Sequence, residues 1–112
     1  MEAISLLRTL GMRPTYAGYD YLAYAITLVS KDRAYLKSVT KNLYNVIGHK
    51  YGVTNICVEA SLRTLITSYW NQHADTILTS LLGYPLYDKP TSSELIIILS
   101  DYLREHQNIT FH

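Results

Sequence analysis

The residues best suited to chemistry in this chain are Glu59 and Arg63, which stand four positions apart in a segment with helical periodicity. A carboxylate can accept a hydrogen bond from a cytosine amino group, and a guanidinium can bind guanine or a phosphate. The same spacing also suits an ion pair along one helix face, which needs no ligand. The sequence supports the two interpretations equally.

The neighbours of this pair on the same helix face are mostly small and neutral. If the helix enters a DNA groove, six residues could face base edges: Asn55, Cys57, Glu59, Ala60, Arg63 and Thr64. Cys57 could instead act as a nucleophile near a helix N-terminus, where the pKa of a thiol falls. Because no histidine lies near it in the sequence, an unreactive thiol is the preferred interpretation.

Basic residues concentrate in the middle of the chain. Residues 31–73 contain six Lys and Arg against two Asp and Glu, net +4, whereas 1–30 are neutral and 74–112 have a net charge of −3. Such cations favour the neutralisation of DNA phosphates over the alternative, a solvated helix face. The backbone amides at a helix N-terminus can also hold phosphate; alternatively, the Thr and Ser hydroxyls there only cap the helix. The phosphate-binding candidates are Lys37, Lys41, Lys50, Thr54, Thr91 and Ser92.

Other classes of function find little support in the composition. The 112 residues contain no glycine-rich phosphate loop, no paired carboxylates at productive spacing and no catalytic serine motif, so we expect no enzyme and no cofactor. The four histidines lack the spacing of a zinc site, and no metal is expected. The single cysteine and the absence of a long apolar run favour a cytoplasmic protein without a membrane span.

Apolar residues recur at helical spacing almost throughout, which predicts an all-α, compact six-helix domain over 1–112. We expect helices over 2–10, after Gly18, from Asp32 to Gly52, over 55–71, over 75–82, and after a Thr91-to-Glu94 capping box. The expected buried positions are Ile4, Leu6, Leu7, Leu10, Tyr21, Leu22, Ala25, Ile26, Val29, Leu36, Val39, Leu43, Val46, Ile47, Val58, Leu62, Leu65, Ile66, Tyr69, Leu95, Ile98, Leu99, Tyr102 and Leu103.

The turn Tyr51-Gly52-Val53-Thr54 organises the candidate site. Gly52 can adopt the left-handed conformation that ends a helix, Val53 can enter the core, and Thr54 can cap the next helix. A helix, a short turn containing glycine and a second helix are typical of a helix-turn-helix. We place this motif at about 36–71.

Motifs of specific residue types are scattered across nearly the whole chain. They are Gly18-Tyr19-x-Tyr21-Leu22, Ser38-Val39-Thr40-Lys41-x-Leu43-Tyr44, Val58-Glu59, Trp70, Leu82-Gly83-Tyr84, Lys89-Pro90-Thr91-x-Ser93-Glu94, and Leu103-Arg104 with His106. Together they resemble the C-terminal DNA-binding effector domain of the stage 0 sporulation protein A family, the response regulators that initiate sporulation. The resemblance implies a six-helix domain that reads a short DNA box, often as a tandem dimer, and that acts with RNA polymerase.

The departures from this family concern the helix that would read DNA. The family usually has arginine at the positions of Cys57 and Ala60 and histidine at Thr64, next to Glu59 and Arg63, which this chain keeps. We also expect no receiver domain, because Met1 directly precedes the effector region; the chain is either a fragment or a stand-alone relative. Two functions remain: a transcriptional regulator with altered or relaxed sequence preference, or a degenerate domain that serves as a protein-interaction or dimerisation module.

Overall fold

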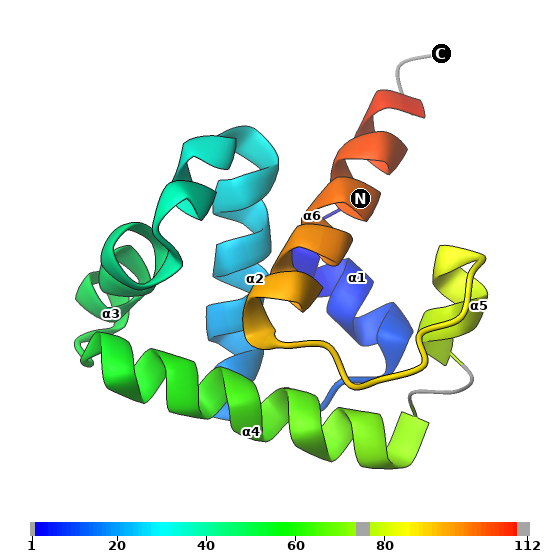
Figure 1. Cartoon of the computed structure of the whole chain (residues 1–112), viewed down its shortest axis with the longest axis horizontal. Coiled ribbons are helices and arrows are strands. Elements are labelled where there is room, and N and C mark those ends of the chain that lie inside the picture. The colour runs from blue at the N-terminus through cyan, green and yellow to red at the C-terminus, as the bar shows by residue number, and fades with distance from the viewer. Residues whose placement is uncertain (1, 74–76, 110–112) are drawn as a thin grey trace.

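The structure, a computed structural model, describes residues 2–73 and 77–109 (Figure 1). Within these ranges the chain forms six α-helices, a 3-10 helix and a π-helix, with a short π turn at residues 77–78 and no strand. The predicted all-α fold is confirmed. The elements are α1 (Ala3–Leu10), α2 (Ala17–Lys31), the 3-10 helix η1 (Arg33–Lys37), the π-helix η2 (Val39–Tyr44), α3 (Asn45–Tyr51), α4 (Asn55–His73), α5 (Thr79–Leu82) and α6 (Ser92–Ile109).

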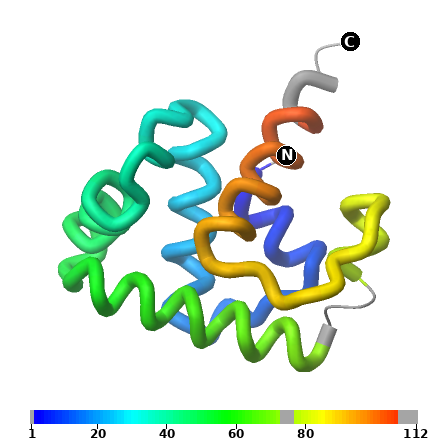
Figure 2. Tube along the Cα trace, in the orientation of Figure 1, coloured from blue at the N-terminus to red at the C-terminus, as the bar shows by residue number. Residues whose placement is uncertain are grey.

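Helix α2 lies at the centre and makes its most extensive contacts with α4 and α6. All five residues predicted for its apolar stripe are buried: Tyr21, Leu22, Ala25, Ile26 and Val29. Helix α4 runs along one edge of the molecule, from α3 at one end to α5 at the other (Figures 1 and 2). This arrangement buries one side of α4 and leaves the other side accessible along its length.

The predicted continuous helix between Asp32 and Gly52 is wrong. Asp32 does act as a cap, since its carboxylate accepts a hydrogen bond from the Ala34 amide at 2.9 Å, but the helix that it opens is the short η1. Ser38 then adopts an extended backbone (φ −149°, ψ 96°) that interrupts the helix, and η2 follows with π geometry. A π turn is wider than an α turn and changes the register of the residues after it. As a result Tyr44 becomes buried, whereas Val46, which was expected in the core, is only half-buried.

The last two helices agree with the sequence in part. Helix α5 ends at Leu82, as predicted, and Gly83 follows it in the left-handed conformation with a φ of 80°. The predicted first residues of this helix, 75 and 76, lie outside the described ranges. In α6 the expected Leu95, Leu99 and Leu103 are buried, while Ile98 and Tyr102 only flank the core. Ile96, which the sequence analysis did not select, is fully buried.

Candidate nucleic-acid interface

The turn between α3 and α4 has the predicted helix-turn-helix geometry. Gly52 has a φ of 72°, and the amides of Gly52 and Val53 both donate to the carbonyl of Gly48, Val53 at 2.9 Å. Gly48 itself is required by close packing, because a Cβ there would lie 2.5 Å from the Val53 carbonyl oxygen. The Thr54 hydroxyl accepts from the Cys57 amide at 3.1 Å and so caps α4. These contacts fix the angle at which α4 leaves the turn.

Helix α4 separates an apolar side from an accessible side as the sequence predicted. Its five predicted core residues, Val58, Leu62, Leu65, Ile66 and Tyr69, are all buried. Five of the six candidates for base contacts are exposed: Cys57, Glu59, Ala60, Arg63 and Thr64. The sixth, Asn55, is half-buried, and its amide donates to the side-chain oxygen of Asn45 at 2.8 Å. Asn55 therefore also ties the two helices of the motif together.

Two of the exposed residues form an ion pair. Arg63 Nη2 lies 2.6 Å from Glu59 Oε1, and both side chains remain about half exposed or more. An exposed pair of this kind contributes only a few tenths of a kcal/mol, about 0.3–0.5, to a helix. The pair is thus easily opened by a stronger partner for either charge.

A groove beside this ion pair is lined by further polar side chains. It has a volume of about 360 Å³ and lies between η2, α4 and the segment that leads into α6. Arg63 and Lys89 line it, and the Lys89 ammonium donates to the Thr67 hydroxyl at 3.0 Å. Lys89 was not among the predicted site residues, because it lies in the acidic third of the sequence and only the fold brings it against α4. The rest of the lining is Val39, Thr40, Tyr44, Glu59, Ile66, Thr67, Pro90, Thr91, Ser92 and Ser93.

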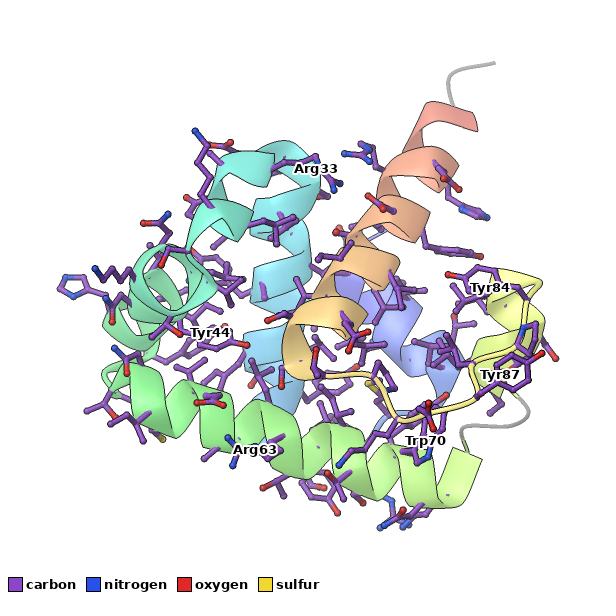
Figure 3. The ribbon with its side chains drawn as sticks, viewed as in Figure 1. Arg33, Tyr44, Arg63, Trp70, Tyr84 and Tyr87 are labelled. Carbon is purple, nitrogen blue, oxygen red and sulfur yellow. The ribbon has the colours of Figure 1, made fainter. Side chains whose placement is uncertain are left out.

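Tyr44 forms the floor of this groove between α3 and the first turn of α6, and Arg63 borders it from α4 (Figure 3). Burial raises the pKa of the Tyr44 hydroxyl, and hydrogen bonds with Ser93 and Ser92 lower it by a smaller amount. The tyrosine therefore stays neutral and holds the start of α6 against η2. The Ser92 hydroxyl, a predicted phosphate ligand, is turned towards this tyrosine.

The N-terminus of α6 has the predicted capping box. The Thr91 hydroxyl accepts from the Glu94 amide at 3.1 Å, and the Glu94 carboxylate accepts from the Thr91 amide at 3.0 Å. These hydrogen bonds from the Thr91 backbone and side chain hold the pKa of Glu94 below its usual value. The Thr91 side chain is thus engaged as a cap, and the wall of the groove is rigid at this point.

Residues 3–103 match the family described as "Sporulation initiation factor Spo0A C terminal". The chain belongs to this family. The match extends from the start of α1 to Leu103 in α6, and it includes the helix-turn-helix and the groove beside it. The resemblance inferred from the scattered motifs is thereby confirmed. The family consists of DNA-binding transcription factor domains and is not an enzyme family. As a member of the family, this chain is a DNA-binding domain of the sporulation-regulator type.

The cations of this Spo0A-type domain are less concentrated than the sequence count indicated. Arg33 pairs with Asp101 of α6 at 2.6 Å, and Lys50 lies over the rings of Tyr24 and Tyr51, 5.0 Å and 5.6 Å from their centroids. The other two predicted lysines, Lys37 in η1 and Lys41 in η2, have exposed side chains. The net charge of +4 over 31–73 therefore does not act as one patch.

Two further predictions concern absences. Among residues 2–73 and 77–109 no three His, Cys, Asp or Glu side chains come together as metal ligands. No helix in the same ranges combines the length and the apolar character needed to cross a bilayer.

Proposed function

We propose that this domain regulates transcription by inserting α4 into the major groove of duplex DNA, with altered or relaxed sequence preference relative to its family. The observation that carries the proposal is the exposed side of α4. It follows a fixed helix-turn-helix turn and is bordered by a groove with two cations, Arg63 and Lys89. A helix held in this way can enter a major groove with its N-terminal residues nearest the bases.

Phosphate binding is assigned to the side of α4 that carries the groove. Lys41 follows Thr40 at one wall of the groove, and Lys37 precedes it in η1, so these lysines would contact one stretch of DNA backbone. Lys89 and the backbone amides at the start of α6 lie at the opposite wall of the same groove and would contact a further stretch of backbone, where a helix N-terminus favours an anion. Lys50 is a weaker candidate because it lies over two tyrosine rings. Thr54, Thr91 and Ser92 are weaker because their hydroxyls cap helices or bond to Tyr44. Lys89 also donates to Thr67, but its ammonium has three N–H donors and keeps two for a phosphate.

Relaxed specificity follows from the residues available for base contacts. Each bidentate arginine contributes about 1–3 kcal/mol of discrimination against a wrong base. Cys57 and Ala60 replace two arginines that are usual in the family, and Arg63 is held by Glu59 in the free domain. The remaining direct readers are Glu59, Arg63 and, through its carboxamide, Asn55.

A second function is favoured by one observation, the 74% exposure of Ile56 at the start of α4. An apolar side chain of this size at the tip of a reading helix also suits a protein partner. In this alternative the domain keeps its fold and serves as an interaction or dimerisation module without reading DNA.

We extend the first proposal to a second copy of the domain and to RNA polymerase as partners. Tyr84 and Tyr87, which are exposed beside α5, offer a surface at the far end of α4 from the turn (Figure 3). Sedimentation of the domain with and without a duplex that carries two adjacent boxes tests the second copy. A complex with only one domain per duplex at saturation would contradict it.

The main proposal is tested by fluorescence anisotropy with a duplex that carries the family's DNA box and with a scrambled duplex, each across a salt series. We expect binding to both, with a steep loss of affinity as salt rises and a small preference for the box. Absence of binding even at low salt would refute DNA reading and favour the interaction module.

A further inference from the structure

The centre of the accessible side of α4 is apolar. Ile56, Ala60 and Thr64 follow one another at intervals of four residues, about one helical turn, and all three are exposed. Ala60 lies opposite the buried stripe that contains Leu62 and Tyr69, so this row is on the accessible side of the helix. Ala60 and Thr64 also border a hollow beside the start of α2. Its first member, Ile56, is 74% exposed and is the most exposed aliphatic side chain among the large hydrophobics of the described residues.

Thr64 adds to the apolar character of this row. Its hydroxyl donates to the Ala60 carbonyl at 3.0 Å, an interaction within the helix that uses its one proton. Thr64 can therefore offer a ligand its methyl group and a hydroxyl oxygen that accepts, but no hydrogen-bond donor. The row Ile56, Ala60 and Thr64, here called the methyl row, therefore presents aliphatic groups over two successive turns.

Charged side chains border the methyl row. Arg63 and Glu59 lie beside it on α4 as an ion pair, with 62% and 49% of their side chains exposed, and Lys89 lies in the adjoining groove. Two of these three charges are positive, and the pair is weak enough for a polyanion to draw Arg63 away from Glu59. A ligand that fits both the methyl row and the cations must carry an array of negative charges. It must also present apolar groups where the exposed side of α4 would contact it. Duplex DNA provides this combination at thymine, whose 5-methyl group projects into the major groove between two phosphate strands.

We propose that the methyl row makes thymine the principal base read by this domain, through contacts with its 5-methyl group. Thymine would then take the place of the guanines that the family's arginines at the positions of Cys57 and Ala60 would select. The inference rests on the proposed insertion of α4 into the major groove. Ile56, at the N-terminal end of the helix, makes the largest contact, and Ala60 and Thr64 allow the helix to approach the bases closely. The preferred site is then rich in A·T pairs.

The test compares two 20-base-pair duplexes, alternating d(AT) and alternating d(AU), which differ only in the 5-methyl group. Burial of one methyl against an aliphatic side chain contributes about fourfold in affinity. We therefore expect d(AT) to bind at least about fourfold more tightly than d(AU) to the wild-type domain by fluorescence anisotropy at fixed salt. Ile56→Ala should reduce this ratio to near one, and circular dichroism should show that its fold is unchanged.

Lys41→Ala is the matched control, because the loss of a phosphate contact should weaken both duplexes and leave their ratio as in the wild type. Equal affinity of the wild type for d(AT) and d(AU), with the expected salt dependence, would overturn the methyl inference and leave DNA binding intact. A preference for d(AT) that Ile56→Ala retains would also overturn it, because the preference would then come from duplex shape. Failure to bind either duplex at low salt would refute the proposed function itself.

Discussion

The guanidinium of Arg63 lies 2.6 Å from the carboxylate of Glu59, one helical turn away on the exposed side of α4. The two charged groups at the candidate interface thus neutralise each other in the free domain. Contact between Arg63 and DNA requires the guanidinium either to leave Glu59 or to be shared with it. The pair therefore sets how strongly this helix attracts a phosphate backbone.

Replacement of Glu59 by glutamine should strengthen DNA binding. The change removes a negative charge that faces the phosphates and releases Arg63, and we expect an affinity gain of about threefold or more at low salt for any sequence. Stability to urea should change by no more than about 0.5 kcal/mol, since the pair is exposed. Arg63→Ala should act in the opposite direction on affinity. A weaker Glu59→Gln complex would mean that Glu59 makes a favourable base contact.

Lys89→Ala should weaken binding to all duplexes by a similar factor. One lost phosphate contact lowers the slope of log affinity against log salt by about 1. Lys31→Ala is a suitable control, because Lys31 lines a separate cavity with Glu2 and Asp20 beside α1. If the salt slope is unchanged in Lys89→Ala, or falls equally in Lys89→Ala and Lys31→Ala, the groove is not part of the DNA interface.

Gly48→Ala should destabilise the domain, although alanine in a helix usually stabilises it by roughly 0.5–1 kcal/mol relative to glycine. The added Cβ would meet the Val53 carbonyl oxygen at 2.5 Å, and a backbone atom cannot move aside without distortion of the turn. We expect a loss of about 1–3 kcal/mol in the free energy of unfolding, measured by urea denaturation. The exposed substitution Lys41→Ala should change it by less than about 0.5 kcal/mol. A Gly48→Ala variant as stable as the wild type would contradict the packing described for the turn.

Tyr69→Phe should destabilise the link between α1 and α4. The Tyr69 hydroxyl donates to the Leu10 carbonyl at 2.6 Å, and its loss leaves a buried acceptor at the end of α1, at a cost of about 1–3 kcal/mol. Burial raises the pKa of Tyr69 to about 12 from the usual 10.0. Because the unfolded chain ionises first, the wild type should lose stability as the pH rises from 10 to 12.

This alkaline loss should be smaller in Tyr69→Phe, which lacks the ionisable group. Thermal unfolding of both proteins between pH 8 and pH 11.5 measures the difference. If the stability of the two proteins falls equally between pH 8 and pH 11.5, the pKa of Tyr69 is not raised in the folded protein.

Local patterns in the sequence predicted much of the fold. The capping box at Thr91 and the left-handed Gly52 depend on residues within one turn of each other, and the buried side of α4 follows from a simple helical period. The register of residues 33–44 could not be obtained in this way. It depends on an extended residue, Ser38, and on a π turn whose formation is decided by packing.

The candidate site was predicted less completely because part of it is assembled by long-range contacts. Lys89 reaches Thr67, 22 positions earlier, and Arg33 is drawn away from the basic segment to Asp101, 68 positions later. Neither pairing leaves a periodic or local signal in the sequence. The exposed residues of α4 were predictable because one helix presents them all.

The location of the DNA-binding surface is tested most directly by NMR titration of the ¹⁵N-labelled domain with a duplex. We expect the largest amide shifts in three places: from Thr54 to Thr67 on α4, at Lys37 to Lys41, and at Lys89 to Ser93. These would place the helix-turn-helix and its groove on DNA. Shifts confined to the region of Tyr84 and Tyr87, or no shifts at low salt, would contradict the assignment of α4 as the helix that reads DNA.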